Sequence, residues 1–96
     1  MTIPVVNKRN IRPEEGDVYI GRGSPWGNRY VIGVDGKRAE VIAKYEAWIA
    51  ERPGLVERLV ALGPRRLVCY CAPAACHGDV LAALLEARTI AARGER

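Results

Sequence analysis

The sequence contains no phenylalanine, a single histidine and a single methionine, and it has no long hydrophobic run. A membrane-spanning helix needs about 18 consecutive apolar residues, so we expect no membrane partner. The first ten residues turn polar and charged at once, which is not the pattern of a secretion signal. Three cysteines cannot all pair within one chain. We therefore expect a cytoplasmic protein with reduced thiols, where clustered cysteines serve metal binding or chemistry more often than disulfides.

The charged residues form no block of one sign and no basic amphipathic helix. The 15 Lys and Arg residues outnumber the 11 Asp and Glu residues, which gives a net charge of +4. Acidic residues are interspersed among the basic ones, as in the segments RPEEGD and ERPGLVER. A dispersed positive charge aids solubility and attracts anions without specifying a partner. We therefore do not expect sequence-specific nucleic-acid binding.

Nearly half of the 96 residues, 49%, are hydrophobic, which suits one small globular domain over residues 1–96. Short apolar and β-branched runs predict strands at residues 3–7, 18–21 and 66–71, with a short edge strand within 29–36. Apolar residues at helical spacing predict helices over 38–51, 55–62 and about 76–92, followed by a frayed tail at 93–96. Strands separated by helices predict a small α/β fold, with a mostly parallel sheet of three to four strands packed with about three helices.

Two unusual loops follow predicted strands. The segment GRGSPWGN, residues 21–28, begins where one strand ends, and the segment APAACHG, residues 72–78, follows another. Ligands of open parallel sheets bind outside the carboxyl ends of the strands. If these two strands are parallel, both loops open at the same edge of the sheet and form one cleft.

All three cysteines and the only histidine fall within nine positions. Cys76 and His77 open the last predicted helix, where the helix dipole lowers the pKa of a thiol, so we assign them as candidate catalytic nucleophile and base. Cys71 ends a strand and is expected to converge with them as a ligand contact. Gly78 would let a ligand approach the backbone closely. Asp79 is a further candidate contact, although an acidic residue in a first helical turn is favourable by itself.

A metal site is an alternative use of these residues. The pattern C-x-C-x4-C-H offers four ligands, which is the number that tetrahedral zinc needs. All four would come from one turn, whereas closed zinc sites draw on two segments. Cys69 is expected to be a small buried side chain one pleat below Cys71. We therefore expect no metal cofactor, with zinc as the alternative.

The glycine-rich loop supplies the remaining candidate ligand-binding residues, which are Gly21, Arg22, Ser24, Trp26, Gly27 and Asn28. Arg22 and Ser24 would grip a phosphate, and Trp26 would stack on a base. The loop lacks the lysine of a P-loop and the spacing of a dinucleotide-binding loop. The competing interpretation is an ordinary turn, in which Gly27 and Asn28 adopt left-handed conformations and Trp26 covers the sheet.

The stretches VYIGRGSPWGN, DGKRAEVIAKYEAWI and LVCYCAPAACHGDVLA together resemble the domain-of-unknown-function family 4326, which is found in tailed phages and bacteria. The resemblance runs from about Val5 to about Ala87. Its matched positions are Gly21, Arg22, Trp26, Gly27, Asn28, Arg38, Cys71, Pro73, Cys76, His77, Gly78 and Asp79. This chain departs from the family pattern after Asn28, where Arg29 stands in place of the usual proline, while Tyr30 keeps the usual aromatic residue. This chain is also similar to the domain-of-unknown-function family 488, in which a strand ends in cysteine and the next helix opens with cysteine and histidine. The resemblance implies a shared ligand site and no established activity.

We therefore expect the cleft to bind a small phosphorylated or nucleotide-like molecule, with thiol-dependent chemistry as an open question. Whether the chain is an enzyme does not follow from the sequence. One alternative is a non-catalytic phage protein that binds a host protein in the host cytoplasm. The other alternative is a small structural zinc-binding module.

Overall fold

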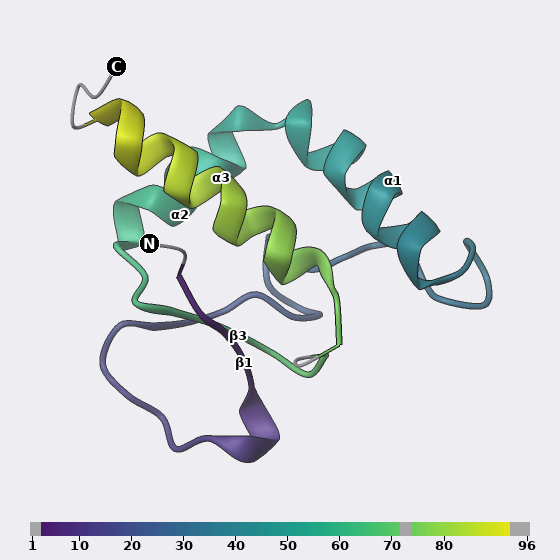
Figure 1. Ribbon diagram of the computed structural model, residues 1–96, viewed down its shortest axis with the longest axis horizontal. Coiled ribbons are helices and arrows are strands. Elements are labelled where there is room, and N and C mark those ends of the chain that lie inside the picture. Colours follow the sequence, from purple (N-terminus) through teal and green to yellow (C-terminus); the bar gives the residue numbers. More distant parts are fainter. Residues whose placement is uncertain (1–2, 72–73, 93–96) are drawn as a thin grey trace.

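A three-stranded parallel sheet in the order β1–β3–β2 forms one layer of the molecule (Figure 1). The strands are β1 (Val5–Asn7), β2 (Asp17–Tyr19) and β3 (Arg66–Cys69). The central strand pairs with both neighbours, so that Val68 lies opposite Val6 on one side and Tyr19 on the other. The computed structural model describes residues 3–71 and 74–92. The predicted tail at 93–96 lies outside the described residues. The predicted parallel α/β sheet is confirmed.

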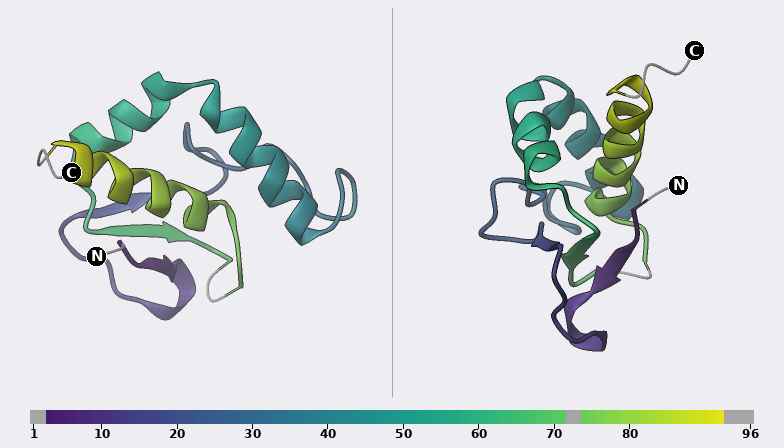
Figure 2. Two further views of the ribbon diagram at one scale, coloured as in Figure 1. Left: turned by 45° about the horizontal axis from the view of Figure 1, so that its top comes forward. Right: turned by 90° about the vertical axis from the view of Figure 1, so that its left-hand side faces the viewer.

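Three helices form the second layer, and both Figure 1 and the left view of Figure 2 show them together on one side of the sheet. They are α1 (Arg38–Ala50), α2 (Pro53–Leu62) and α3 (His77–Ala92), and a short 3-10 turn, η1 (Lys8–Asn10), follows β1. Proline occupies the first position of α2, where its missing N–H costs nothing. Gly63 ends α2 in the left-handed conformation that favours glycine. These boundaries agree with the predicted helices to within a few residues.

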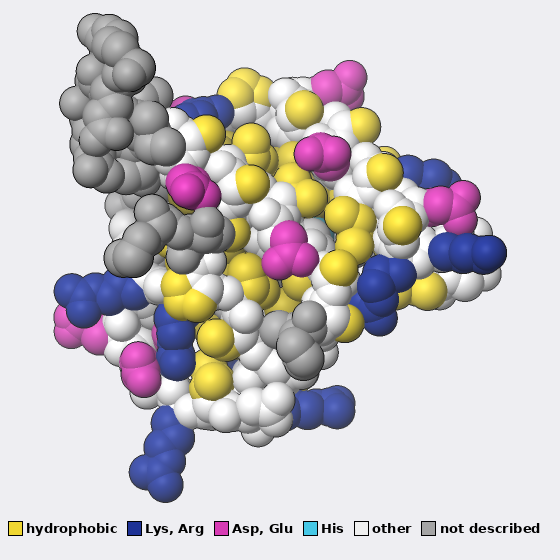
Figure 3. All heavy atoms as spheres, viewed as in Figure 1, with side chains coloured by type: hydrophobic (Ala, Val, Ile, Leu, Met, Phe, Trp, Pro, Cys, Tyr) yellow, Lys and Arg dark blue, Asp and Glu magenta, His cyan; other side chains and the backbone are white. Residues whose placement is uncertain are grey.

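The core lies between the two layers. Leu67 and Cys69 of β3 are almost fully buried against Tyr45 of α1, Leu59 of α2 and Leu81 of α3. Each helix thus contributes the apolar stripe that its sequence period predicts. On the face viewed in Figure 3, Lys and Arg side chains lie mainly toward the margins, whereas hydrophobic side chains, with some Asp and Glu side chains among them, occupy the middle. Among the described helices, none is both long and apolar enough to cross a membrane.

The expected edge strand within residues 29–36 is wrong. This segment is a turn held by one isolated bridge between Ile32 and Gly36. The Asp35 carboxylate accepts a hydrogen bond from the Val31 N–H at 2.8 Å, and the Gly33 N–H donates to the Gly36 carbonyl at 2.8 Å. Val34 remains 80% exposed. The segment therefore satisfies these polar groups locally, without pairing with the sheet.

The amino end of the sheet is fixed by an ion pair. Asp17 and Arg66 are register partners on β2 and β3, and the guanidinium donates to both carboxylate oxygens, at 2.7 and 2.8 Å. These hydrogen bonds from Arg66, and one from the Glu14 N–H, lower the pKa of Asp17 from 3.8 to about 2. The opposite, carboxyl end of the sheet is left to the two loops predicted to carry function.

Candidate functional site

The glycine-rich loop and the cysteine turn meet at the carboxyl edge of the sheet, as the parallel topology predicts. The ladder continues past β2, because the Ile20 N–H donates to the Val68 carbonyl at 2.9 Å. Nε2 of His77, the first residue of α3, lies 2.7 Å from the Ile20 carbonyl oxygen. A carbonyl oxygen only accepts hydrogen bonds, so Nε2 carries the proton and donates it. This bond joins the end of β2 to the start of α3.

A cavity of about 450 Å³ opens between the two loops and the start of α1. Six of the predicted site residues line it, namely Gly21, Arg22, Asn28, Cys71, Cys76 and His77. Its other lining residues are Tyr19, Tyr30, Val31, Ile32, Arg38, Val41, Ile42, Cys69, Tyr70 and Ala75. The volume falls within the range of about 300–1,000 Å³ that is common for small-molecule sites. The remaining predicted residues, which are Ser24, Trp26, Gly27, Gly78 and Asp79, are not among the lining residues.

The charged side chains that line this cavity are two arginines, Arg22 and Arg38. No carboxylate is among the described lining residues. Arg38 is positioned by a hydrogen bond from its guanidinium to the Ala75 carbonyl at 2.9 Å. Arg22 is exposed and forms no hydrogen bond or ion pair within residues 3–71 and 74–92. The cavity therefore has a positive lining with one guanidinium fixed and the other available.

Aromatic rings form part of the same wall. Tyr19 and Tyr70 meet edge to face, with ring centroids 6.2 Å apart. The Lys8 ammonium lies 5.3 Å from the Tyr19 ring centroid, and the Arg9 guanidinium lies 5.6 Å from that of Tyr70. These two cations follow β1 and add to the positive field around the cavity.

The glycine-rich loop satisfies most of its own polar groups. Both the N–H and the hydroxyl of Ser24 donate to the Gly21 carbonyl, at 3.1 and 2.7 Å. The left-handed residue of the loop is Gly23, with φ of 93°, so the expectation that Gly27 and Asn28 take this conformation is wrong. A Cβ atom on Gly27 would lie 2.7 Å from the Gly21 carbonyl oxygen, so the loop needs glycine there for close packing. Ser24 thus closes a turn with Gly21, and Gly27 allows the loop to pass close to the Gly21 carbonyl.

Trp26 belongs to the core, which is a correction to its expected place as a ligand platform. It is 6% exposed, and its indole N–H donates to the Leu55 carbonyl at 2.8 Å. Its own carbonyl accepts the Tyr45 hydroxyl proton at 2.7 Å. The competing interpretation, in which the ring covers the sheet, is the one that describes its position. Trp26 ties the loop to α1 and α2 and leaves ligand contact to its neighbours.

Asn28 connects the cavity to α1. Its side-chain oxygen accepts the Tyr30 N–H at 2.9 Å, and its amide nitrogen lies 3.4 Å from the Val41 carbonyl oxygen. These bonds fix the exit of the loop, so the part of Asn28 that faces the cavity is held in place. The side chain is half-buried and lines the cavity together with Tyr30.

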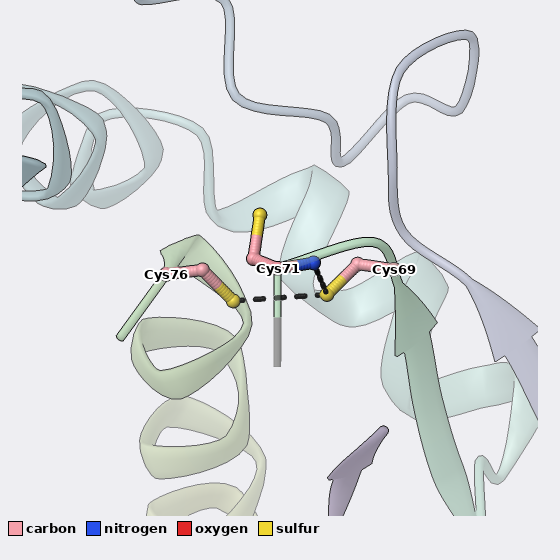
Figure 4. Close-up of side chains that lie close together, drawn as sticks. All are labelled: Cys69, Cys71 and Cys76. Carbon is pink, nitrogen blue, oxygen red and sulfur yellow. Dashed lines mark hydrogen bonds between the residues drawn. The ribbon is translucent and has the colours of Figure 1, made fainter. Parts of the chain in front are cut away.

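The three cysteines converge at the boundary between the core and the cavity (Figure 4). The Sγ atoms of Cys69 and Cys76 point toward each other at 3.7 Å, and all three Sγ atoms lie within 4.8 Å of one another. Cys71, Cys76 and His77 all line the cavity, but the side chains whose ligand atoms lie close together are Cys69, Cys71 and Cys76, because the His77 ring bonds to the Ile20 carbonyl. Such a cluster of thiols could hold a metal ion. Pro73, a matched position in the turn, lies outside the described residues.

Two backbone groups donate to this sulfur cluster. The Cys71 N–H points at the Cys69 Sγ at 3.5 Å, and the Gly78 N–H points at the Cys76 Sγ at 3.3 Å. Cys76 precedes the first residue of α3, and its own N–H donates to the Asp79 carboxylate at 3.1 Å. The Asp79 carboxylate thus caps the start of α3 as the acidic residue of a capping box does, while the Cys76 Sγ accepts the N–H of Gly78 rather than that of Asp79. This capping accounts for Asp79, which lies at the helix start rather than in the cavity lining.

Gly78 is buried, and its neighbours are protein side chains. A Cβ atom there would lie 2.7 Å from Cγ1 of Val5, 3.1 Å from Cδ1 of Ile20 and 3.3 Å from the Cys76 Sγ. The position requires glycine because α3 begins directly on the sheet. We expected a ligand to approach Gly78 closely, but Val5 of β1 and Ile20, the residue after β2, lie there instead.

The pKa of the Cys76 thiol is raised rather than lowered. The hydrogen bond with Cys69 and the burial of Cys76 outweigh the favourable Gly78 N–H. The pKa of Cys71 is also raised, by burial and by the neighbouring Cys69. His77 is 5% exposed, donates to Ile20 and meets the Tyr45 ring edge to face at 5.1 Å. We expected the helix start to lower the pKa of Cys76, but in the metal-free protein its surroundings raise that pKa.

Sequence reasoning missed several residues of the cavity. Arg38 was a matched position of the family resemblance but was not assigned to the site, although it lies 37 residues from its partner Ala75. The tyrosines that line the cavity, Tyr19, Tyr30 and Tyr70, were not assigned to the site either. Cys69 was expected to pack passively, although strand alternation already placed it on the same face as Cys71. That alternation was the available signal for a three-cysteine cluster.

The chain belongs to the family described as Domain of unknown function (DUF4326), whose model matches residues 4–87. This match covers most of the 96 residues and includes both loops of the site. Searches of curated proteins and of solved structures each return no match. The family resemblance noted in the sequence is therefore confirmed, and the site must be interpreted from its own chemistry.

Proposed function

We propose that the cavity binds a small anionic molecule that also carries a flat, largely apolar part, such as a phosphorylated or nucleotide-like compound. One observation carries this proposal. The charged lining side chains are both arginines, Arg22 and Arg38, and tyrosine rings share the same wall. Arginine is the residue that best matches phosphate oxygens, because its planar guanidinium can donate two parallel hydrogen bonds.

The two ends of such a ligand would meet different parts of the cavity. Arg22, whose guanidinium has no partner among the described residues, would contact the phosphate directly, while Arg38 is held by the Ala75 carbonyl and would present its other N–H groups. The ring faces of Tyr30 and Tyr70 offer apolar surface for a base or another planar group. Asn28 would supply a polar contact close to Tyr30. Ser24 and Trp26 act through the shape of the loop in this proposal.

A binding screen tests the proposal. We would measure nucleoside monophosphates, the matching nucleosides and inorganic phosphate by thermal shift and then by calorimetry. A phosphorylated compound should bind more tightly than its nucleoside. Arg22→Gln and Arg38→Gln should each weaken binding by about 10- to 100-fold, as expected for a lost hydrogen bond to a charged group.

A matched control is available on α2. Arg58→Gln removes the same charge from an exposed position outside the cavity lining, and it should leave the affinity unchanged. If the control lowers the affinity as much as Arg22→Gln does, the ligand responds to net charge rather than to this cavity. If no phosphorylated compound binds more tightly than its nucleoside, the proposal is overturned.

A structural zinc module is the second candidate function, and the three clustered thiols favour it. A structural zinc site is closed by four protein ligands. Among the described residues the cluster contains three such side chains, from the end of β3 and the start of α3. Thiols of this kind suit a reducing compartment such as the cytoplasm.

A further inference from the structure

We infer that Cys69, Cys71 and Cys76 bind one zinc ion as three thiolates, and that the fourth coordination position of the ion faces the cavity. The metal-binding part of this inference stands on the cysteine cluster alone. We further infer that a molecule bound in the cavity can reach the ion through this position, and this second part rests on the proposed function. The two parts are separated by the experiments below.

The sulfur geometry is close to that of a zinc site. A zinc–sulfur distance of about 2.3 Å in a tetrahedron separates two ligand sulfur atoms by about 3.8 Å. The Sγ atoms of Cys69 and Cys76 are 3.7 Å apart, and the cluster with Cys71 spans no more than 4.8 Å. Binding therefore requires the Cys71 side chain to move by about 1 Å at most. Cys71 is half-buried and follows the end of β3, where such a movement does not disturb the sheet.

The surroundings favour metal-bound thiolates. The Cys71 N–H and the Gly78 N–H already point at two of the sulfur atoms, at 3.5 and 3.3 Å. Backbone N–H groups that donate to ligand sulfur atoms orient them and stabilise their negative charge. The start of α3 and the Arg38 guanidinium, bonded to the carbonyl of the residue before Cys76, add positive potential.

The fourth position is left to the cavity. His77 directs its Nε2–H at the Ile20 carbonyl, and the Asp79 carboxylate accepts the Cys76 N–H outside the cavity lining. Neither belongs to the group of described ligand atoms that lie close together. All three cysteines line the cavity. Three protein ligands and one open position are the arrangement of catalytic rather than structural zinc sites.

Zinc binding displaces the protons of the three thiols. Each thiol releases its proton to the solvent as its sulfur binds the ion, so one Zn²⁺ replaces up to three protons. The open position then takes a water molecule or a donor atom of the bound molecule. Thiolate ligands select soft or borderline metals, and the open cavity beside the cluster favours four-coordinate zinc over a three-coordinate copper(I) ion.

Metal content tests the cluster without any organic ligand. We would purify the full chain from medium containing zinc and measure its metal by native mass spectrometry and elemental analysis. We expect one zinc per chain in the wild type, and a loss of most of it in Cys71→Ser. Ser24→Ala is the matched control outside the cluster, and it should keep its zinc. Absence of zinc from the wild type after reconstitution with zinc chloride overturns the inference, as does stoichiometric copper(I) binding in preference to zinc.

Cobalt(II) bound in place of zinc shows whether the fourth coordination position is open. Cobalt-loaded wild type should show a thiolate charge-transfer band and the visible bands of a tetrahedral ion, and Cys71→Ser should lose about one third of the charge-transfer intensity per bound ion. Added imidazole or azide should shift the visible bands, because these small donors can enter an open position. His77→Gln should leave the cobalt spectrum unchanged. A spectrum that neither imidazole nor azide changes would contradict an open fourth position, and so would a spectrum that changes in His77→Gln.

These outcomes are independent of the nucleotide screen. A zinc-loaded protein that binds no phosphorylated compound would contradict the proposed function and leave the metal site intact. A protein without zinc that binds such a compound through Arg22 and Arg38 would do the reverse. Because Cys69 is 1% exposed, its replacement would perturb the core, so the metal site is tested with Cys71→Ser and with the wild-type spectra.

Discussion

The hydroxyl group of Tyr45 gives the sharpest test of how the glycine-rich loop is held. Tyr45 lies on α1 with no exposed surface, and its hydroxyl donates to the Trp26 carbonyl at 2.7 Å. Its ring contacts His77 edge to face, with centroids 5.1 Å apart. Tyr45→Phe removes one oxygen atom and keeps these ring contacts. The variant therefore isolates a single buried hydrogen bond between α1 and the loop.

The expected loss follows from what remains after the change. The Trp26 carbonyl loses its donor in a place that is 6% exposed, so water cannot readily replace the hydroxyl. A buried carbonyl left without a partner costs about 1–3 kcal/mol. For a domain of this size each kcal/mol lowers the melting temperature by about 4–8 °C. We therefore expect Tyr45→Phe to melt about 4–24 °C below the wild type.

Urea denaturation followed by circular dichroism measures this loss, and an unchanged m-value shows that the surface exposed on unfolding is the same. Tyr70→Phe is the matched control for stability. Tyr70 is 49% exposed and its hydroxyl forms no hydrogen bond with the described residues, so the change should stay within about 0.5 kcal/mol. If Tyr45→Phe is as stable as Tyr70→Phe, this hydrogen bond does not hold the loop to α1.

Three further substitutions test other parts of the fold. Trp26→Phe removes the indole donor to the Leu55 carbonyl and should cost about 1–3 kcal/mol in urea denaturation, whereas an indole that faced solvent would show no loss. Gly78→Ala should lower the melting temperature, because the new methyl group overlaps buried side chains at a cost of about 1–3 kcal/mol, and a stabilised variant would contradict that packing. Asp17→Asn should destabilise the protein at neutral pH. Because pairing with Arg66 lowers the pKa of Asp17 from 3.8 to about 2, this stability is present above pH 3.8 and is lost as the pH falls through 2. Melting curves of both proteins should therefore converge in acid, and a constant difference would exclude the ion pair as the cause.

The elements of the fold were predictable from the sequence because their signals are local. Val41, Tyr45 and Ile49 recur at helical spacing and form the buried stripe of α1. Proline and glycine mark both ends of α2. The parallel order of β2 and β3 then followed from the alternation of strands and helices, and it brought the two loops to one edge.

The direction of individual side chains was not predictable, because distant partners decide it. The indole N–H of Trp26 is satisfied by Leu55, 29 residues away. The His77 ring bonds to Ile20, 57 residues earlier in the chain, so it does not complete a cysteine–histidine pair. The segment at 29–36 has the composition of a strand, but the Asp35 carboxylate and the bridge between Ile32 and Gly36 close it into a turn.

The charge of the site links the metal to the proposed ligand. Three neutral thiols carry no charge, whereas three thiolates with one Zn²⁺ carry one negative charge in total. An anion that is bound only by Arg22 and Arg38 would therefore bind less tightly to the zinc-loaded protein. An anion that places a donor atom in the fourth position of the ion would bind more tightly, because the bond to zinc replaces a water molecule.

We expect the second result, since the cysteine cluster and both arginines line the same cavity. The test is the affinity of the tightest phosphorylated compound for metal-free and zinc-loaded protein, measured at one ionic strength. Linkage requires that the compound raise the zinc affinity by the same factor by which zinc raises the affinity for the compound. Arg58→Gln, which changes the net charge from outside the cavity, should leave that factor unchanged. A weaker affinity in the zinc-loaded protein would mean that the compound occupies the cavity without touching the ion, and the three thiolates would then serve the structure of the turn.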